Sequence, residues 1–314
     1  MEDYYIMKIN TAAIIGAGAI GAYLWWGLNE CLGRNVCFVA SGKRKERLEK
    51  DGIILNKKAY MPAVKTPTQA KGADLLIIAT KYGALREILP DIKEIATENT
   101  IVMSVLNGVD SEEIIAEAVN PSQIIYSLIR IASQRVGNVT DYDEGDIGGL
   151  FFGEPDSKNA SSERLNALDT LFSQTPIVYH ISDDILKEQW CKYAWNLSYN
   201  LPQAILNVGI GAYTDSSHVR FISEKIWYEA AAIASAKGID IGGYLLPRST
   251  LKNTARFSTL QDLDAGRPTE IDMFAGAMIR LGKELNIPVP YCEFAYHAVK
   301  ALEERGAGKF DYGA

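Results

Sequence analysis

The first half of the chain alternates apolar runs of strand length with amphipathic stretches of helix length. The apolar runs are of the buried type found in parallel sheets, and residues 85–96 between the last two have a helical pattern. This alternation is typical of a doubly wound parallel sheet, in which ligands bind at the carboxyl ends of the strands. The predicted strands are residues 12–15, 35–40, 73–80 and 100–106.

Beyond Ser127 the pattern shortens into strand-like segments separated by glycines. We expect these segments to extend the sheet at one edge. The predicted elements are short strands over residues 129–134, 139–142 and 148–152, a helix over 162–173, and a last strand over 176–180.

From residue 182 onward the pattern is helical almost throughout, and 314 residues are many for a single hydrophobic core. The sequence therefore predicts an α/β Rossmann-type doubly wound sheet over residues 1–181. It predicts an all-α domain over residues 182–314, with a cleft between the two domains. The predicted helices of the second domain are residues 184–207, 217–237, 272–285 and 292–305.

Composition and charge indicate an ordinary soluble globular protein, with 47% hydrophobic and 23% charged residues. The net charge of −7 argues against a nucleic-acid-binding surface. The chain has no apolar run of membrane-spanning length and no secretory signal pattern, so we expect a cytoplasmic protein without a membrane partner. The four cysteines and three histidines lack metal-ligand spacing, so no metal is expected. Residues 1–6 form a short extension to which we assign no function.

The stretch between the first predicted strand and the helix after it matches the pattern G-x-G-x-x-G. In that position the first glycine permits a tight turn, the second lets the backbone approach a pyrophosphate, and the third lets helix and strand pack closely. The flanking elements favour dinucleotide binding over an ordinary strand-to-helix turn. The stretch reads Gly16-Ala17-Gly18-Ala19-Ile20-Gly21.

The residues after the second predicted strand indicate which dinucleotide binds. In NAD-binding domains an acidic residue about 20 positions beyond the glycines holds the ribose 2′-hydroxyl, but no Asp or Glu occurs between Glu30 and Glu46. Ser41, Lys43 and Arg44 would bind a 2′-phosphate through charge-assisted hydrogen bonds, so the predicted cofactor is NADPH. The alternative is that the basic residues are simply a solvated helix start.

A polar stripe is expected on the first long helix of the second domain. Lys192, Asn196 and Asn200 stand at positions i, i+4 and i+8, which places them on one helix face among large aromatic residues. A lysine and two amides suit a surface that grips a small anionic ligand. The alternative is an exposed polar stripe without function. In the first domain, Lys81 and Asn107 follow predicted strands, at the edge where ligands bind.

A second polar cluster lies between residues 257 and 272. Thr269 and Glu270 precede an apolar helix and could serve only as its cap. The charged residues Asp262, Asp264 and Arg267 are more often solvated surface charges than ligands.

Four separated stretches resemble the ketopantoate reductases (2-dehydropantoate 2-reductases) over nearly the whole chain. The first is shared with many dehydrogenases, whereas the order and spacing of the last two are specific. The stretches are Ile14-Ile15-Gly16-Ala17-Gly18-Ala19-Ile20-Gly21, Asn107-Gly108-Val109, Lys192-x-x-x-Asn196-x-x-x-Asn200, and Ser258-Thr259-Leu260-Gln261-Asp262 followed by Gly266-Arg267-x-Thr269-Glu270-Ile271-Asp272.

The resemblance implies reduction of a 2-oxo acid, ketopantoate, to pantoate with NADPH, on the pathway to pantothenate. It implies a helical domain like the C-terminal domain of 6-phosphogluconate dehydrogenase and a small anionic 2-oxo acid as partner. The sequence leaves the oligomeric state open: the helical domain could form a homodimer interface, or its aromatic helices could be core. Lys192 matches the family's proton donor. The other implied roles are substrate contacts for Asn107, Asn196, Asn200 and Ser258, cofactor contacts for Lys81, Asn107 and the backbone of Ala132, and a place near cofactor and active site for Glu270.

Two positions depart from the family pattern, both on the substrate side. Ile210 stands where the family often has an asparagine before Gly211, and Ala255 stands where it often has one three residues before the serine. These departures support one alternative, a reductase of a different 2-oxo acid on the same scaffold. A second alternative, a non-catalytic regulator that binds NADPH, ranks lower, because it would not need Lys192, Asn196 and Glu270 together. Oxidation of NADPH by any oxo acid separates the enzymes from the regulator.

Overall fold

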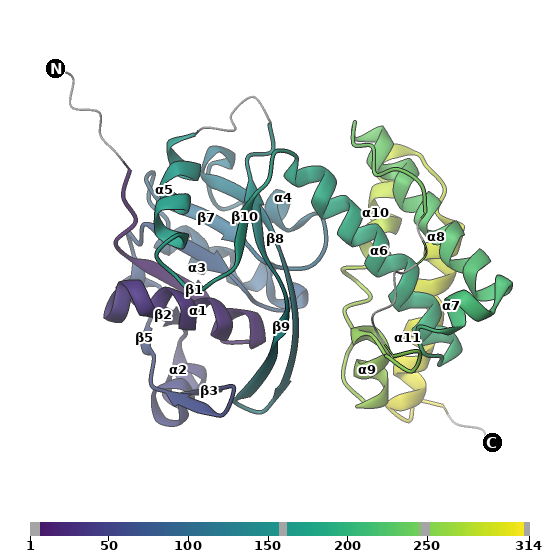
Figure 1. Cartoon of the computed structure of the whole chain (residues 1–314), viewed down its shortest axis with the longest axis horizontal. Helices are drawn as coiled ribbons and strands as arrows, with labels where there is room; N and C mark the ends of the chain where they lie inside the picture. Colours follow the sequence, from purple (N-terminus) through teal and green to yellow (C-terminus); the bar gives the residue numbers. More distant parts are fainter. Residues whose placement is uncertain (1–6, 157–161, 245, 247–251, 311–314) are drawn as a thin grey trace. The chain divides into compact units, whose positions relative to one another are not determined.

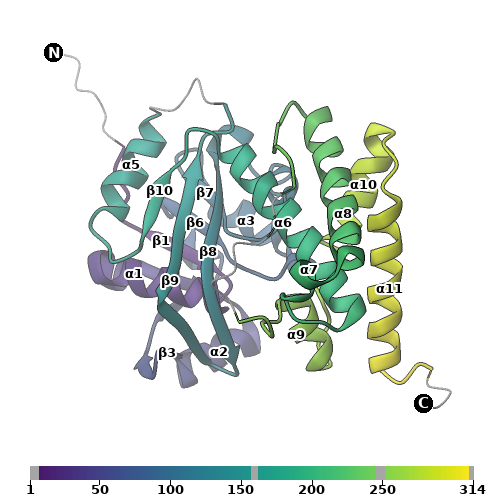
Figure 2. The ribbon, with the colours of Figure 1, turned by 45° about the vertical axis from the view of Figure 1, so that its right-hand side comes forward.

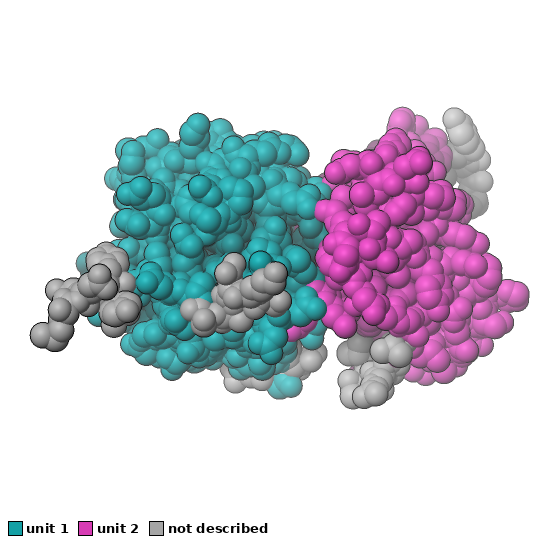
Figure 3. All heavy atoms as spheres, turned by 90° about the horizontal axis from the view of Figure 1, so that it is seen from above, with its two compact units in different colours: residues 1–186 teal, residues 187–314 magenta. Residues whose placement is uncertain are grey.

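A computed structural model describes residues 7–156, 162–244, 246 and 252–310 of the protein. The chain divides into two compact units, residues 1–186 and residues 187–314 (Figure 3). Within the described residues, no helix is long and apolar enough to cross a membrane.

Unit 1 is built on a sheet in which ten strands are described, in the order β4-β3-β9-β8-β7-β6-β1-β2-β5, with β10 paired to β9. Strand β1 pairs in parallel with β2 on one side and with β6 on the other, and the parallel pairing continues through β7 to β8. The strands are β1 Ala12–Ile15, β2 Val36–Val39, β3 Ile53–Leu55, β4 Lys58–Tyr60, β5 Ala63–Lys65, β6 Leu75–Ile78, β7 Ile101–Ser104, β8 Ile124–Val136, β9 Val139–Gly153 and β10 Tyr179–Ile181.

Both faces of this sheet are covered by helices (Figure 1). Alternate residues of a strand point to opposite faces, so Ile14 joins one hydrophobic core and Ile15 the other. The first core includes residues of α1 and α5, and the second includes residues of α3 and α4. This arrangement confirms the predicted doubly wound sheet. The helices are α1 Ala19–Leu32, α2 Gly42–Asp51, α3 Leu89–Ile95, α4 Ser111–Ile115 and α5 Glu163–Phe172.

The prediction of three short strands after residue 129 was wrong, because the structure has one long antiparallel hairpin, β8 and β9. The glycines that suggested turns lie inside β9, where the pairing register shifts on either side of Ile131. A Cβ on Gly148 would stand 2.7 Å from the Cβ of Arg130, and Gly149 has φ of +97°. These glycines therefore permit an irregular, closely packed ladder rather than a chain reversal.

Unit 2 is helical, as predicted (Figure 2). Helix α9 was not predicted, and α10 begins at Ala275 rather than at residue 272. Helix α10 packs on α8 and α11, and α11 also packs on α8. The helices are α6 Ile185–Leu206, α7 Ala212–Asp215, α8 Ser217–Ala236, α9 Ser258–Asp264, α10 Ala275–Leu285 and α11 Pro290–Gly306.

Helix α6 contains a proline, Pro202, which has no backbone N–H to donate within the helix. The carbonyl of Ser198, four residues earlier, instead accepts a hydrogen bond of 2.7 Å from the hydroxyl of Ser223 on α8. The hydroxyl of Tyr213 likewise donates to the carbonyl of Tyr199. These contacts fasten the second half of α6 to its neighbours, and this half carries part of the candidate site.

Candidate active site

The glycine turn lies where the strand order of unit 1 reverses, between β1 and β6. Gly16 has φ of +111°, and a Cβ there would stand 2.4 Å from the carbonyl oxygen of Ala79, just beyond β6. A Cβ on Gly21 would stand 1.9 Å from the carbonyl oxygen of Gly16. Helix α1 begins after Gly18, which supplies no side-chain cap, and no acidic residue lies in the first turn. Only glycine fits this turn, and the helix start after it suits an anion.

The other residues predicted to hold the cofactor lie mostly at the same edge of the sheet. Ser41 is the exposed residue before α2, and Lys43 and Arg44 are exposed in the first turn of that helix. Lys81 follows β6 and is exposed, and half-buried Asn107 follows β7. Since carboxyl ends of parallel strands meet at one edge, the structure brings these residues to the edge that carries the glycine turn.

Ala132 lies in β8, several residues beyond the point where β8 pairs with β7. It lies at the register shift between Ile131, which pairs with Ile147 of β9, and Ser133, which pairs with Tyr142. Sequence reasoning placed it through the family resemblance alone, since nothing in the local pattern marks it.

The polar stripe on α6 exists in unit 2. Lys192 and Asn196 are half-buried, and Asn200 is 4% exposed. The neighbouring aromatic residues Tyr193 and Tyr199 are buried, so the stripe is bordered by packed protein. The alternative of an exposed polar stripe therefore does not describe this face.

Sequence reasoning missed Gln203, which continues the stripe at position i+11 from Lys192. Its side chain is 0% exposed. Its Nε2 donates to the carbonyl of Ala255 at 3.1 Å, and its Oε1 accepts from the backbone N–H of Phe257 at 2.5 Å. Gln203 thereby fastens to α6 the segment that leads into Ser258, the exposed first residue of α9. The helical spacing was the signal that could have revealed it.

Tyr193, next to Lys192, fastens a second segment to α6. Its hydroxyl contacts the carbonyl oxygens of Met273 at 3.2 Å and Phe274 at 2.6 Å. Those two residues donate their backbone N–H groups to the carbonyl of Glu270, which is half-buried. The turn that carries Glu270 is therefore fixed to the helical turn that carries Lys192.

The structure assigns structural contacts to two residues of the second polar cluster, Thr269 and Asp262. Thr269 does not cap α10, which begins at Ala275; its N–H and hydroxyl both donate to Glu303 at 2.7 Å. Asp262 is not a solvated surface charge, since its side chain is only 11% exposed and pairs with the Nε of Arg267 at 2.8 Å. Both contacts serve the structure of this segment.

The two departures from the family pattern lie beside each other. Ile210 is 2% exposed, and its backbone N–H donates to the carbonyl of Ala255 at 3.1 Å. The next residue, Gly211, donates its N–H to the carbonyl of Asn253 at 3.0 Å. The turn around Ile210 and the segment around Ala255 therefore form one contact, beside the polar stripe.

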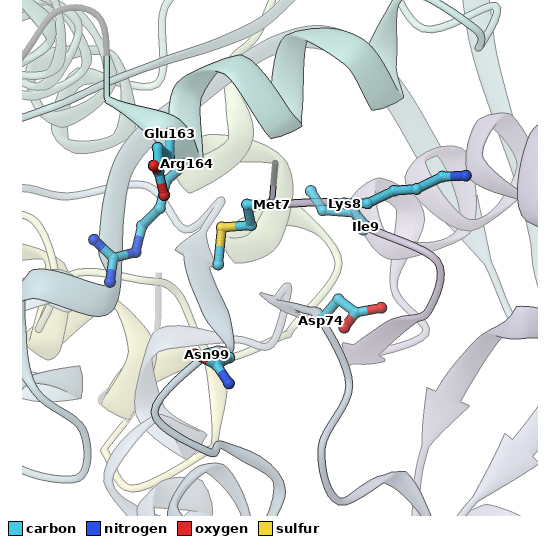
Figure 4. Close-up of a pocket in the computed structure, with 7 residues that line it drawn as sticks. All are labelled: Met7, Lys8, Ile9, Asp74, Asn99, Glu163 and Arg164. Carbon is cyan, nitrogen blue, oxygen red and sulfur yellow. The ribbon is translucent and has the colours of Figure 1, made fainter. Parts of the chain in front are cut away.

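A cavity of about 340 Å³ lies elsewhere, at the amino-terminal edge of the sheet (Figure 4). One of its two acidic residues, Asp74, precedes β6, and the Oδ2 of Asp74 accepts hydrogen bonds of 2.9 Å from the N–H groups of Asn10 and Thr11. That carboxylate fixes the chain before β1, at the edge opposite the glycine turn. The lining residues are Met7, Lys8, Ile9, Asp74, Asn99, Glu163 and Arg164.

A parallel sheet whose first strand turns through glycines into a helix at the switch point is a Rossmann-type fold, the class to which dinucleotide-binding domains belong. A family model described as ketopantoate reductase PanE/ApbA matches residues 12–157, and one described as ketopantoate reductase PanE/ApbA C terminal matches residues 184–303. Together they span well over half of the chain. The protein therefore belongs to the ketopantoate reductase family and is an oxidoreductase.

Individual relatives agree with this assignment. A 2-dehydropantoate 2-reductase of Pyrococcus horikoshii is 29% identical over 94% of this chain and 98% of its own length. One from Nostoc sp. is 26% identical over 95% of this chain and 97% of its own. The likeness to the structure of D-mandelate dehydrogenase with NADH and anilino(oxo)acetate shows the fold alone, with a TM-score of 0.80 at 22% identity over 95% of this chain and 99% of that one.

Proposed function

We propose that this protein reduces a small 2-oxo acid to the 2-hydroxy acid with NADPH, and that Lys192 donates the proton. The observation that carries the proposal is the α6 stripe of Lys192, Asn196 and Asn200. Tyr193 and Gln203 fasten to the same helix the segments that hold Glu270 and Ser258. A cation, amides, a hydroxyl and a carboxylate on one scaffold suit the binding of an oxo acid and protonation of its oxygen.

The residues of unit 1 fit a dinucleotide on a structural ground. Any side chain at Gly16 would fill the space beside the Ala79 carbonyl, and no side chain caps the start of α1. The bare backbone N–H groups of this turn can therefore face a pyrophosphate. When bound, NADPH would supply the hydride for the ketone carbon. Ser41, Lys43 and Arg44 would hold the 2′-phosphate. Lys81 and Asn107 would contact the nicotinamide side, and the backbone of Ala132 would also contact the cofactor.

The substrate would be held by α6 and α9. Asn200 and Ser258 would donate hydrogen bonds to its carboxylate, and Asn196 would contact it nearby. As negative charge grows on the ketone oxygen, the ammonium group of Lys192 would stabilise it and transfer a proton to it. Glu270 would orient Lys192 or contact the cofactor.

Ketopantoate is the first candidate substrate, because the curated relatives are 2-dehydropantoate 2-reductases. A different 2-oxo acid is the second candidate, and one observation favours it. Ile210 and Ala255 contact each other, and both have apolar side chains. The family pattern often has asparagines at these two positions. Both candidates require the same hydride and proton transfers.

The experiment is NADPH oxidation, followed by absorbance, with a panel of 2-oxo acids that includes ketopantoate. Lys192→Ala is expected to lower turnover roughly 100-fold or more with NADPH affinity unchanged, since general acid catalysis contributes about that much. Lys283→Ala, at an exposed position of α10, is the matched control and keeps wild-type turnover. Near-normal turnover of Lys192→Ala would refute its role. Absence of NADPH oxidation with every acid would refute the enzyme and favour the NADPH-binding regulator.

Cofactor preference has a separate test. Arg44→Ala is expected to weaken NADPH binding about tenfold or more and to leave NADH binding unchanged, because hydrogen bonds to a charged group contribute roughly 1.5–3 kcal/mol. Arg47→Ala, at an exposed position on the same helix, should change neither affinity. Equal effects of Arg44→Ala on both cofactors would contradict the assignment of the 2′-phosphate site. A homodimer and a cytoplasmic location also stay predictions, which sedimentation and cell fractionation would check.

A further inference from the structure

We infer that this protein selects 2-oxo acids with an apolar, hydroxyl-free side chain, through an apolar wall beside the polar stripe of α6. The wall consists of the half-buried residues Trp195, Ala255 and Phe257, which pack against a cluster that includes Tyr199 and Ile210. The inference rests on the proposed function, since it concerns the side chain of the substrate that the stripe would bind.

The wall and the stripe share one helix. Successive residues of a helix are about 100° apart, so Trp195 lies about 60° from Lys192 around α6 and one position before Asn196. The Trp195 ring contacts Tyr199 with centroids 4.8 Å apart and meets Phe257 edge-on at 5.2 Å. Phe257 directly precedes Ser258. A substrate whose carboxylate binds between Asn200 and Ser258 would therefore turn its side chain toward these rings.

The polar backbone atoms of the wall are already paired. The carbonyl of Ala255 accepts from both Ile210 and Gln203, and the N–H of Phe257 donates to Gln203. The N–H of Ala255 donates to Lys252, and the carbonyl of Phe257 accepts from Gln261. Ala255 and Phe257 therefore present side-chain carbon to a ligand, and the indole N–H of Trp195 is the one polar side-chain group of the wall.

The hydroxyl of Ser258 would be taken up by the substrate carboxylate, and two other nearby hydroxyls are out of reach of a ligand. Tyr244 belongs to the same cluster, and its hydroxyl oxygen is buried. The hydroxyl of Thr259, which follows Ser258, is buried as well. A substrate hydroxyl placed against Ala255 and Phe257 would lose its water without gaining a partner, whereas a methyl group would gain contact. The expected discrimination is about tenfold or more in kcat/KM.

Ketopantoate and trimethylpyruvate provide a matched pair, because they differ by one hydroxyl on an otherwise identical branched skeleton. In either reduction NADPH becomes NADP⁺, its hydride bonds to the ketone carbon, and a proton bonds to the oxygen. The test is the ratio of kcat/KM for trimethylpyruvate to kcat/KM for ketopantoate in the full-length wild-type protein. The expected ratio is about ten or more.

Variants show whether the wall sets this ratio. Ala255→Asn adds an amide to the wall and should lower the ratio about tenfold, whereas Ala265→Asn, at an exposed position after α9, should leave it unchanged. Phe257→Tyr adds a hydroxyl with little change in shape; it should lower the ratio too, and it serves as the test if Ala255→Asn does not fold.

The outcomes separate this inference from the proposed function. A wild-type ratio of one or below, or a ratio that neither wall variant changes, overturns the apolar wall and leaves the reductase standing. Absence of NADPH oxidation with every 2-oxo acid refutes the proposed function itself.

Discussion

Gln203→Met is the substitution that tests most sharply how unit 2 holds its candidate site. The methionine side chain has nearly the same length but cannot make either hydrogen bond. Phe257 then loses the partner of its N–H, at a cost of roughly 1–3 kcal/mol for a buried donor. The carbonyl of Ala255 keeps its hydrogen bond from Ile210, so losing the one from Gln203 should cost about 0.5–1.5 kcal/mol. The free energy of unfolding should therefore fall by roughly 1.5–4.5 kcal/mol.

The assay is urea unfolding, followed by circular dichroism and tryptophan fluorescence. The matched control is Gln174→Met in unit 1, an exposed glutamine whose Nε2 donates to the carbonyl of Thr170 and whose loss should cost less than about 0.5 kcal/mol. In folded Gln203→Met the segment before Ser258 is less firmly held, so KM for the oxo acid should rise more than kcat falls. NADPH affinity should stay unchanged. A stability loss no greater than that of the control would refute the reasoning.

Three further predictions follow from other contacts. Gly16→Ala should lower NADPH affinity more than tenfold in calorimetry, because its Cβ would overlap the Ala79 carbonyl. Gly72→Ala is the control, since Gly72 also has positive φ but no atom lies within 4 Å of its added Cβ, so NADPH affinity should not fall. Equal affinities of the two variants would argue against the glycine turn as the cofactor site. Tyr193→Phe should lower the free energy of unfolding by about 1–3 kcal/mol and slow turnover through the displaced turn of Glu270, and an unchanged urea midpoint would contradict this. Burial, reinforced by the carboxylates of Glu112 and Glu113, raises the pKa of Tyr126 to about 12. The folded chain thus keeps a proton that the unfolded chain releases near pH 10, so the free energy of unfolding falls between pH 10 and about 12. Tyr126→Phe should flatten this decline in unfolding experiments. An unchanged slope would show that another group causes it.

Elements whose hydrophobic residues repeat with a clear period along the chain were predictable from the sequence. Strand β1 and the helices α6, α8 and α11 lie within a few residues of their predicted bounds, because continuous apolar runs and sustained helical periods define them. The glycine turn was recognisable because its spacing is fixed by contacts within a few residues and with β6. Local pattern was sufficient in these cases.

Other features depend on partners distant in sequence. The length of the β8–β9 hairpin was hidden because glycines that usually mark turns pack against Arg130 and Val178 inside the ladder. Gln203 looked like an ordinary helix polar residue, since its partners lie about 50 positions away. The sequence does not reveal the contact between Ile210 and Ala255 either, although each position departs from the family pattern. Tertiary contacts decide such features, and a single sequence does not display them.

The most direct test of hydride transfer to a 2-oxo acid uses NADPH that carries deuterium at the transferred position of the nicotinamide. The protein is incubated with this cofactor and a 2-oxo acid, and the product is analysed by mass spectrometry and nuclear magnetic resonance. We predict a 2-hydroxy acid with deuterium on the former ketone carbon and a hydroxyl proton from solvent. Cofactor that stays reduced, or a product without deuterium at that carbon, would contradict the account.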